Sequence, residues 1–94
     1  MNKINWVEII NEISNTDGKK RPIYFEEEYY DFIICGDKKR MMGFMMVWNV
    51  DSLRAIHISR MHINENLFFL PMTGHDREIP QGLKIEDLTP DIDE

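Results

Sequence analysis

Three histidines, one cysteine and a scatter of carboxylates are the side chains here that could carry catalytic or metal chemistry. His57 and His62 are five residues apart, which puts them on opposite faces of a strand and about 140° apart on a helix. Neither spacing makes them adjacent ligands, and no H-E-x-x-H or paired-cysteine motif accompanies them. The single cysteine, Cys35, excludes a disulfide within the chain. We therefore expect no metal site and no cofactor.

Acid–base catalysis would need a pairing of Asp31 with one of these histidines. Such a pair works only when a substrate is held beside it, and the sequence has no glycine-rich elbow, P-loop or G-x-G-x-x-G motif to do so. We interpret the chain as a non-enzymatic protein. A small enzyme that uses Asp31 with His57 or His62 is the alternative.

The acidic residues are concentrated in two places, residues 26–28 and residues 86–94. Five of the 17 acids lie in residues 86–94, which hold no base, so the rest carries 12 acids against 11 bases. Most of the net charge of −6 therefore belongs to an acidic tail. Acids interleaved with apolar residues can occupy a basic groove that would otherwise hold phosphates, although a solvated tail is the simpler interpretation. We predict that eight carboxylates bind a partner: Glu26, Glu27, Glu28, Glu86, Asp87, Asp91, Asp93 and Glu94.

Two Lys-Lys-Arg clusters, at residues 19–21 and 38–40, could contact phosphates. The glutamates at 26–28 and the acidic tail would repel a polyanion, so we expect no direct nucleic-acid binding. A nucleic-acid binder that uses these two loops is a further alternative.

The uncharged stretch at residues 41–50 predicts the central strand of the fold, because it is too short to cross a membrane and rich in β-branched and aromatic side chains. In a strand, Met45 and Val47 face one side, and Met46 and Trp48 face the other. Both faces are apolar, so both need cover.

The remaining elements follow from local patterns. Asn5 and Glu8 match a capping box, which predicts a helix from about residue 6 to residue 15. The apolar runs predict strands at residues 23–25, 29–35, 41–50, 53–63 and 67–70, and the glutamate triplet 26–28 marks a turn, a bulge or an exposed edge. A helix over 53–63 is the competing prediction.

These elements predict an α+β fold in which one N-terminal helix packs on an antiparallel β-meander of four to five strands. The 94 residues suffice for a single modest core, which we assign to residues 1–85, and residues 86–94 form an irregular acidic tail. One short helix covers part of one sheet face. We therefore predict a homodimer through the other face, with four residues at the interface: Met42, Phe44, Met46 and Trp48.

Location follows from what the sequence lacks. Residues 70–74 match the LPxTG pentapeptide that sortases cut, but the charged residues 75–78 follow in place of an apolar span and the sequence ends in acidic residues, so we treat the match as coincidence. No apolar h-region or membrane-spanning stretch is evident, and we expect a cytoplasmic protein without membrane contact.

In size and composition the chain resembles small acidic phage-encoded anti-defence proteins, the anti-restriction and anti-CRISPR inhibitors. The abundance of Phe, Tyr, Met, Ile, Asn and Lys beside a single alanine is typical of AT-rich genes, which fits an origin in a phage, a mobile element or an AT-rich bacterium. The resemblance implies an inhibitor that blocks a basic partner, such as a host nuclease, by a nucleic-acid-mimicking surface. The alternative is an immunity or antitoxin protein that neutralises a basic toxin.

Overall fold

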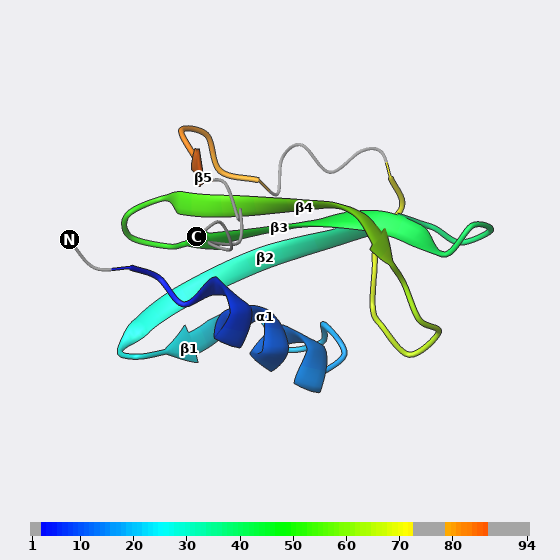
Figure 1. Cartoon of the computed structure of the whole chain (residues 1–94), viewed down its shortest axis with the longest axis horizontal. Coiled ribbons are helices and arrows are strands. Elements are labelled where there is room, and N and C mark those ends of the chain that lie inside the picture. Colours follow the sequence, from blue (N-terminus) through cyan, green and yellow to red (C-terminus); the bar gives the residue numbers. More distant parts are fainter. Residues whose placement is uncertain (1–2, 73–78, 87–94) are drawn as a thin grey trace, which may run out of the picture.

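The computed structural model describes residues 3–72 and 79–86. Over these residues the chain forms one helix, α1, and a five-stranded sheet in the order β1-β2-β3-β4-β5 (Figure 1). The elements are α1 (Trp6–Asn15), β1 (Ile23–Phe25), β2 (Glu28–Asp37), β3 (Met42–Asn49), β4 (Arg54–His62) and β5 (Lys84–Glu86). The predicted α+β class, the N-terminal helix and the strand at residues 53–63 are confirmed.

The sheet is mixed, and in this respect the predicted meander is wrong. Strands β1 to β4 pair antiparallel, but β5 pairs parallel to β4. The segment expected to be irregular after residue 73 therefore supplies a strand. The expected strand at 67–70 is absent from the described structure, where Leu70 forms an isolated parallel bridge to Cys35.

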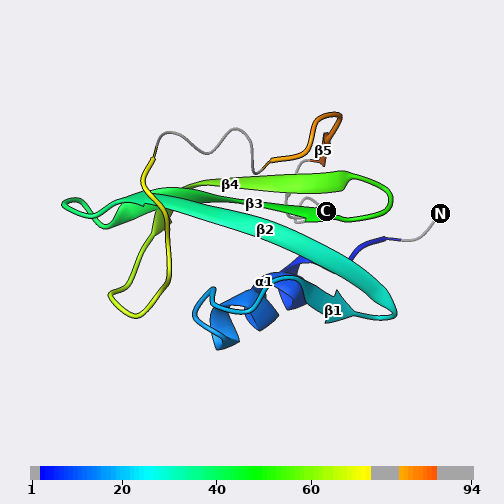
Figure 2. The same cartoon turned by 180° about the vertical axis from the view of Figure 1, so that it is seen from behind.

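Helix α1 begins where the sequence predicts, because the side chain of Asn5 accepts a hydrogen bond from the backbone N–H of Glu8 at 3.2 Å. Its apolar stripe, Trp6, Ile9 and Ile13, is buried against one face of the sheet. Figures 1 and 2 show the helix beneath β2 and beside β1. The core on this side also contains strand residues: Ile23, Tyr30, Phe32, Ile34, Met45, Val47 and Ile56.

The opposite face is not left bare, contrary to our expectation. A second buried cluster lies there, made of Ile33, Cys35, Trp48 and Ala55. The chain after β4 passes the β2 edge at Leu70, whose N–H donates to Ile34 O at 2.9 Å. Leu70, Ile79 and Leu83 then pack on this second cluster, so the C-terminal part of the chain itself covers much of the face.

A β-bulge changes the alternation that the sequence predicts for β4. Gly43 pairs with Met61 and Met45 pairs with Ile58, so two residues of β4 oppose one residue of β3. Arg60 lies in this bulge with φ of 54°. Strict alternation predicts that Met61 shares a sheet face with Ala55. Because of the bulge, Met61 instead packs against the helix-side core.

Candidate partner-binding surface

The first two residues of the glutamate triplet form the turn of the β1–β2 hairpin, one of the three structures predicted for the triplet, and Glu28 begins β2. Phe25 pairs with Glu28, so the loop consists of Glu26 and Glu27 alone, with φ of 51° and 69°. Positive φ at both central residues defines a type I′ turn, which favours Asn and Gly. A left-handed conformation costs other residues roughly 1–2 kcal/mol each. The two exposed glutamates therefore occupy positions at which the left-handed backbone conformation favours Asn and Gly.

A polar cleft lies beside this turn, between it, the β3–β4 turn and the chain that leads into α1. Glu26 and Glu28 contribute carboxylates to the cleft, and Lys3 and Arg54 contribute cations. The full lining is Lys3, Ile4, Glu26, Glu28, Tyr30, Asn49, Ser52 and Arg54.

Asn49 is a buried residue of the cleft lining whose side chain makes several hydrogen bonds. It is 1% exposed, and its Nδ2 donates to Glu28 Oε1 at 2.6 Å. Its Oδ1 accepts the backbone N–H groups of Asp51 and Ser52 at 2.9 and 2.8 Å, which closes the β3–β4 turn. Burial raises the pKa of the neighbouring Tyr30, against the opposing effect of its hydrogen bond with Asn49. The Tyr30 phenol is therefore neutral at physiological pH.

Glu86, expected to begin the tail, is the last residue of β5 and is bound on both oxygens. Trp6 Nε1 donates to Oε1 at 3.2 Å, and Arg54 Nε donates to Oε2. The hydrogen bond from Arg54 holds the pKa of this carboxyl below its usual range, and it raises the pKa of Arg54. Glu86 thus links β5 to both β4 and α1. Asp87, Asp91, Asp93 and Glu94 lie outside the described residues.

Arg54 connects Glu86 with the cleft that Glu26 and Glu28 line. Arg54 lines the cleft together with Glu26 and Glu28, and the same guanidinium binds Glu86. In Figure 1 the β1–β2 turn, the β3–β4 turn and β5 lie toward the same end of the molecule. We refer to Glu26, Glu27, Glu28 and Glu86 as the acidic surface.

The residues predicted for a dimer interface differ in accessibility. Met42 is 38% exposed, Phe44 and Met46 are half-buried, and Trp48 is 4% exposed. Phe44 also lies against His57, with ring centroids 5.4 Å apart. A second copy of the chain could contact Met42, Phe44 and Met46 directly. Trp48 is buried, so it could affect such an interface only through the residues that it packs against.

The residues considered for catalysis are not brought together. Both carboxylate oxygens of Asp31 bind Arg21, at 2.7 and 3.1 Å, and Oδ1 also accepts the N–H of Phe32. His57 and His62 lie on β4, separated from Asp31 on β2 by the intervening strand β3. Within residues 3–72 and 79–86, no group of three or more His, Cys, Asp or Glu side chains could hold a metal ion. The described chain also has no helix long and apolar enough to span a membrane.

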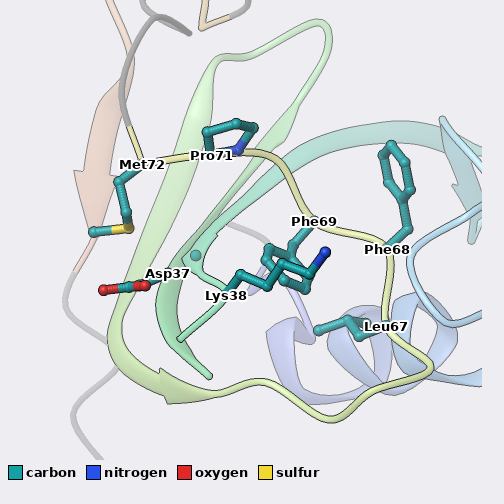
Figure 3. A pocket seen from close by; sticks show the side chains of 8 residues that line it. Asp37, Lys38, Leu67, Phe68, Phe69, Pro71 and Met72 are labelled. Carbon is teal, nitrogen blue, oxygen red and sulfur yellow. The ribbon is translucent and has the colours of Figure 1, made fainter. Parts of the chain in front are cut away.

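Sequence reasoning missed an apolar pocket at the far end of the sheet (Figure 3). Leu67, Phe68 and Phe69 line it with Pro71 and Met72, and the end of β2 and the β2–β3 turn add Gly36, Asp37 and Lys38. Phe68 is 52% exposed and Met72 48%. The apolar run at 67–70, read as a strand, was the available signal.

Comparison with known proteins found no similarity that could assign a class. No family model matches the chain, and neither a curated protein nor a solved structure matches it. Its function must be argued from its own residues.

Proposed function

We propose that this chain is a small non-enzymatic binding protein whose acidic surface docks on a basic protein and blocks it. The observation that supports this most directly is the presence of glutamates at both central positions of the β1–β2 turn. Asn-Gly there would close the same hairpin with less strain. Residues held in sparsely populated backbone conformations cluster at functional sites, where the side chain rather than stability accounts for the choice.

The arrangement of charge supports the same proposal. Glu26 and Glu28 line one cleft with Arg54, and Arg54 binds Glu86, from which the acidic residues 87–94 continue. The rest of the chain is nearly neutral, so long-range attraction to a basic partner comes from these segments. Charges of this kind chiefly raise the association rate and make it depend on salt.

The partner that fits this surface is a protein that handles nucleic acid. The groove of such a protein carries cations that bind phosphates, and a cluster of carboxylates can occupy that groove in place of the phosphates. We place the protein in the cytoplasm of a host cell, as an inhibitor of anti-restriction or anti-CRISPR type encoded by a phage or mobile element. An immunity protein that neutralises a basic toxin would use the same surface.

The test is capture of a partner by the immobilised full chain from a bacterial lysate, with mass spectrometry of the bound proteins. Three baits are compared: the natural chain, Glu26→Gln with Glu27→Gln, and Glu12→Gln with Glu65→Gln. The last pair removes the same charge from exposed residues that do not line the cleft. We expect a basic nucleic-acid-handling protein on the first and third baits, weakened on the second and released by added salt.

The results separate the alternatives. A captured toxin would favour the immunity protein. Equal capture by all three baits, or an absence of any protein on the natural chain, would contradict the proposal. The captured protein should then be purified and its nuclease or other nucleic-acid-dependent activity measured with and without this chain.

A further inference from the structure

The apolar pocket at the far end of the sheet is lined by a segment that backbone hydrogen bonds fix in place. The N–H of Phe68 donates to the carbonyl of Asp17, just after α1, at 2.8 Å. Two residues further on, Leu70 donates to Ile34 O at 2.9 Å and accepts the N–H of Gly36 at 2.8 Å. Small-molecule sites are mostly apolar, largely preformed cavities of roughly 300–1,000 Å³. This pocket has a volume of about 660 Å³.

The absence of a side chain at Gly36 makes room for the inner wall of the pocket. A Cβ at this position would clash with Cδ1 of Ile63 and would lie 3.1 Å from Cδ2 of Phe69. Phe69 therefore packs directly over the backbone of β2 and is half-buried. The outer wall is open to solvent, since Phe68 is 52% exposed and Met72 48%. Exposed apolar side chains gathered at one cavity are typical of a binding site.

Lys38 is the charged group that reaches over this apolar lining. Figure 3 shows its side chain extending across the pocket toward Phe68, whereas the carboxylate of Asp37 points the other way. Asp37 is bound within its own turn, because Oδ1 accepts the N–H of Lys39 at 2.9 Å and Oδ2 lies 3.8 Å from Nε of Arg40. Within residues 3–72 and 79–86, Lys38 has no ion-pair partner. The pocket thus combines an apolar wall with one available cation.

This combination selects a ligand that has an apolar body and one anionic group. A cationic ligand would be repelled by the Lys-Lys-Arg turn at residues 38–40. A nucleotide would bring phosphates that this turn attracts, but its sugar and base edges need hydrogen-bonding partners. Asp37 and Lys38 are the only polar side chains among the described residues of the lining. A carboxylate on a hydrocarbon body has no such need.

We propose that this pocket binds a small amphipathic carboxylate of the fatty-acid type. Its hydrocarbon lies against Phe68 and Phe69, and its carboxylate lies at the ammonium of Lys38. The proposal goes beyond the proposed function and is independent of it, because the pocket and the polar cleft share no lining residue.

The experiment titrates the full chain with decanoate below its micelle concentration, and with decanol and decyltrimethylammonium as neutral and cationic counterparts. Dissociation constants are measured by calorimetry, and the ring resonances of Phe68 and Phe69 are followed by NMR. We expect decanoate to bind more tightly than decanol by about 2- to 5-fold, the range of an exposed ion pair. The cationic counterpart should bind most weakly.

Two variants with matched controls test the two parts of the site. Lys38→Gln should abolish the preference for decanoate over decanol, whereas Lys39→Gln removes the same charge outside the lining and should retain it. Phe68→Ser should weaken binding of both ligands by about 3- to 10-fold, because part of the apolar contact is lost. Tyr24→Ser, at an aromatic residue that is 58% exposed and does not line the pocket, should change neither.

Several results would overturn the proposal. One is a failure of the Phe68 and Phe69 resonances to shift when decanoate is added to the natural chain, a result that requires no variant to fold. Another is an unchanged preference for decanoate in Lys38→Gln. Tighter binding of adenosine monophosphate than of decanoate would favour a nucleotide, and binding to anionic phospholipid vesicles without binding of decanoate would favour a membrane. Ring resonances that move on dilution of the natural chain would show that a second copy occupies the pocket.

Discussion

Arg54 and Glu86 join the start of β4 to the end of β5, although 32 residues separate them in the chain. The same carboxylate accepts the indole N–H of Trp6, so three distant segments meet at one side chain. A strand of three residues has few ladder hydrogen bonds of its own, and this junction helps to hold β5 in place.

The junction predicts a pH-dependent contribution to stability. Because the folded pKa of Glu86 is lowered, its contribution is present above the ordinary carboxyl pKa and is lost as pH falls through the folded value. We expect Glu86→Gln to lower the free energy of unfolding by about 1 kcal/mol near neutral pH, because a charge-assisted hydrogen bond at a partly exposed site is replaced by weaker ones. The difference from the natural chain should shrink in acid. Thermal melts across the pH range measure this, with Glu12→Gln as control, and a difference that is constant with pH would contradict it.

Substitutions in the β1–β2 turn should change stability and partner binding in opposite directions. Glu26→Asn with Glu27→Gly places the favoured residues of a type I′ turn at the two positive-φ positions, and we expect stabilisation of about 1–2 kcal/mol. The same variant removes two carboxylates and should bind the basic partner more weakly. Urea unfolding and the capture assay give the two readouts. A variant that is both less stable and equally bound would refute the account of the turn.

Asn49 should be the most sensitive polar residue at the cleft. Asn49→Ala leaves two backbone N–H groups of the β3–β4 turn and the carboxylate of Glu28 without their partner, and we expect a loss of about 2–4 kcal/mol. Asn64 provides a matched control, since its Oδ1 also accepts two backbone N–H groups, of Asn66 and Leu67, but at an exposed loop. Asn64→Ala should cost about 0.5–1 kcal/mol. Similar losses in both variants would show that burial of Asn49 is not decisive.

The predicted homodimer can be tested at the residues that a second copy could reach. Sedimentation equilibrium at micromolar concentration should give twice the 11.3 kDa chain mass. Met42→Glu should shift the protein toward the monomer, because it places a charge in an apolar interface. Val7→Glu, at a 60% exposed valine on α1, should leave the mass unchanged. If the natural chain sediments as a monomer, the homodimer prediction is wrong.

Local patterns were sufficient for much of the fold. The cap at Asn5, the stripe of Trp6, Ile9 and Ile13, and the alternation of Met45 and Val47 against Met46 and Trp48 all depend on residues a few positions apart. The glutamate triplet was expected to mark a turn, a bulge or an exposed edge, because neighbouring strand side chains alternate in direction and three consecutive charges cannot all point outward. These are short-range consequences of backbone geometry, and the structure agrees with them.

Tertiary structure decided the rest, because it depends on contacts between residues far apart in the chain. Lys84–Glu86 is too short to show a strand period, and its parallel pairing with β4 exists only once the chain has passed the β2 edge at Leu70. That path covers the face expected to be bare, and it turns Glu86 from a tail charge into the partner of Arg54 and Trp6. The bulge at Arg60 likewise depends on the register between β3 and β4. The sequence by itself determined where the carboxylates are along the chain, and only the folded chain determined that Glu28 binds Asn49 and that Glu86 binds Arg54 and Trp6.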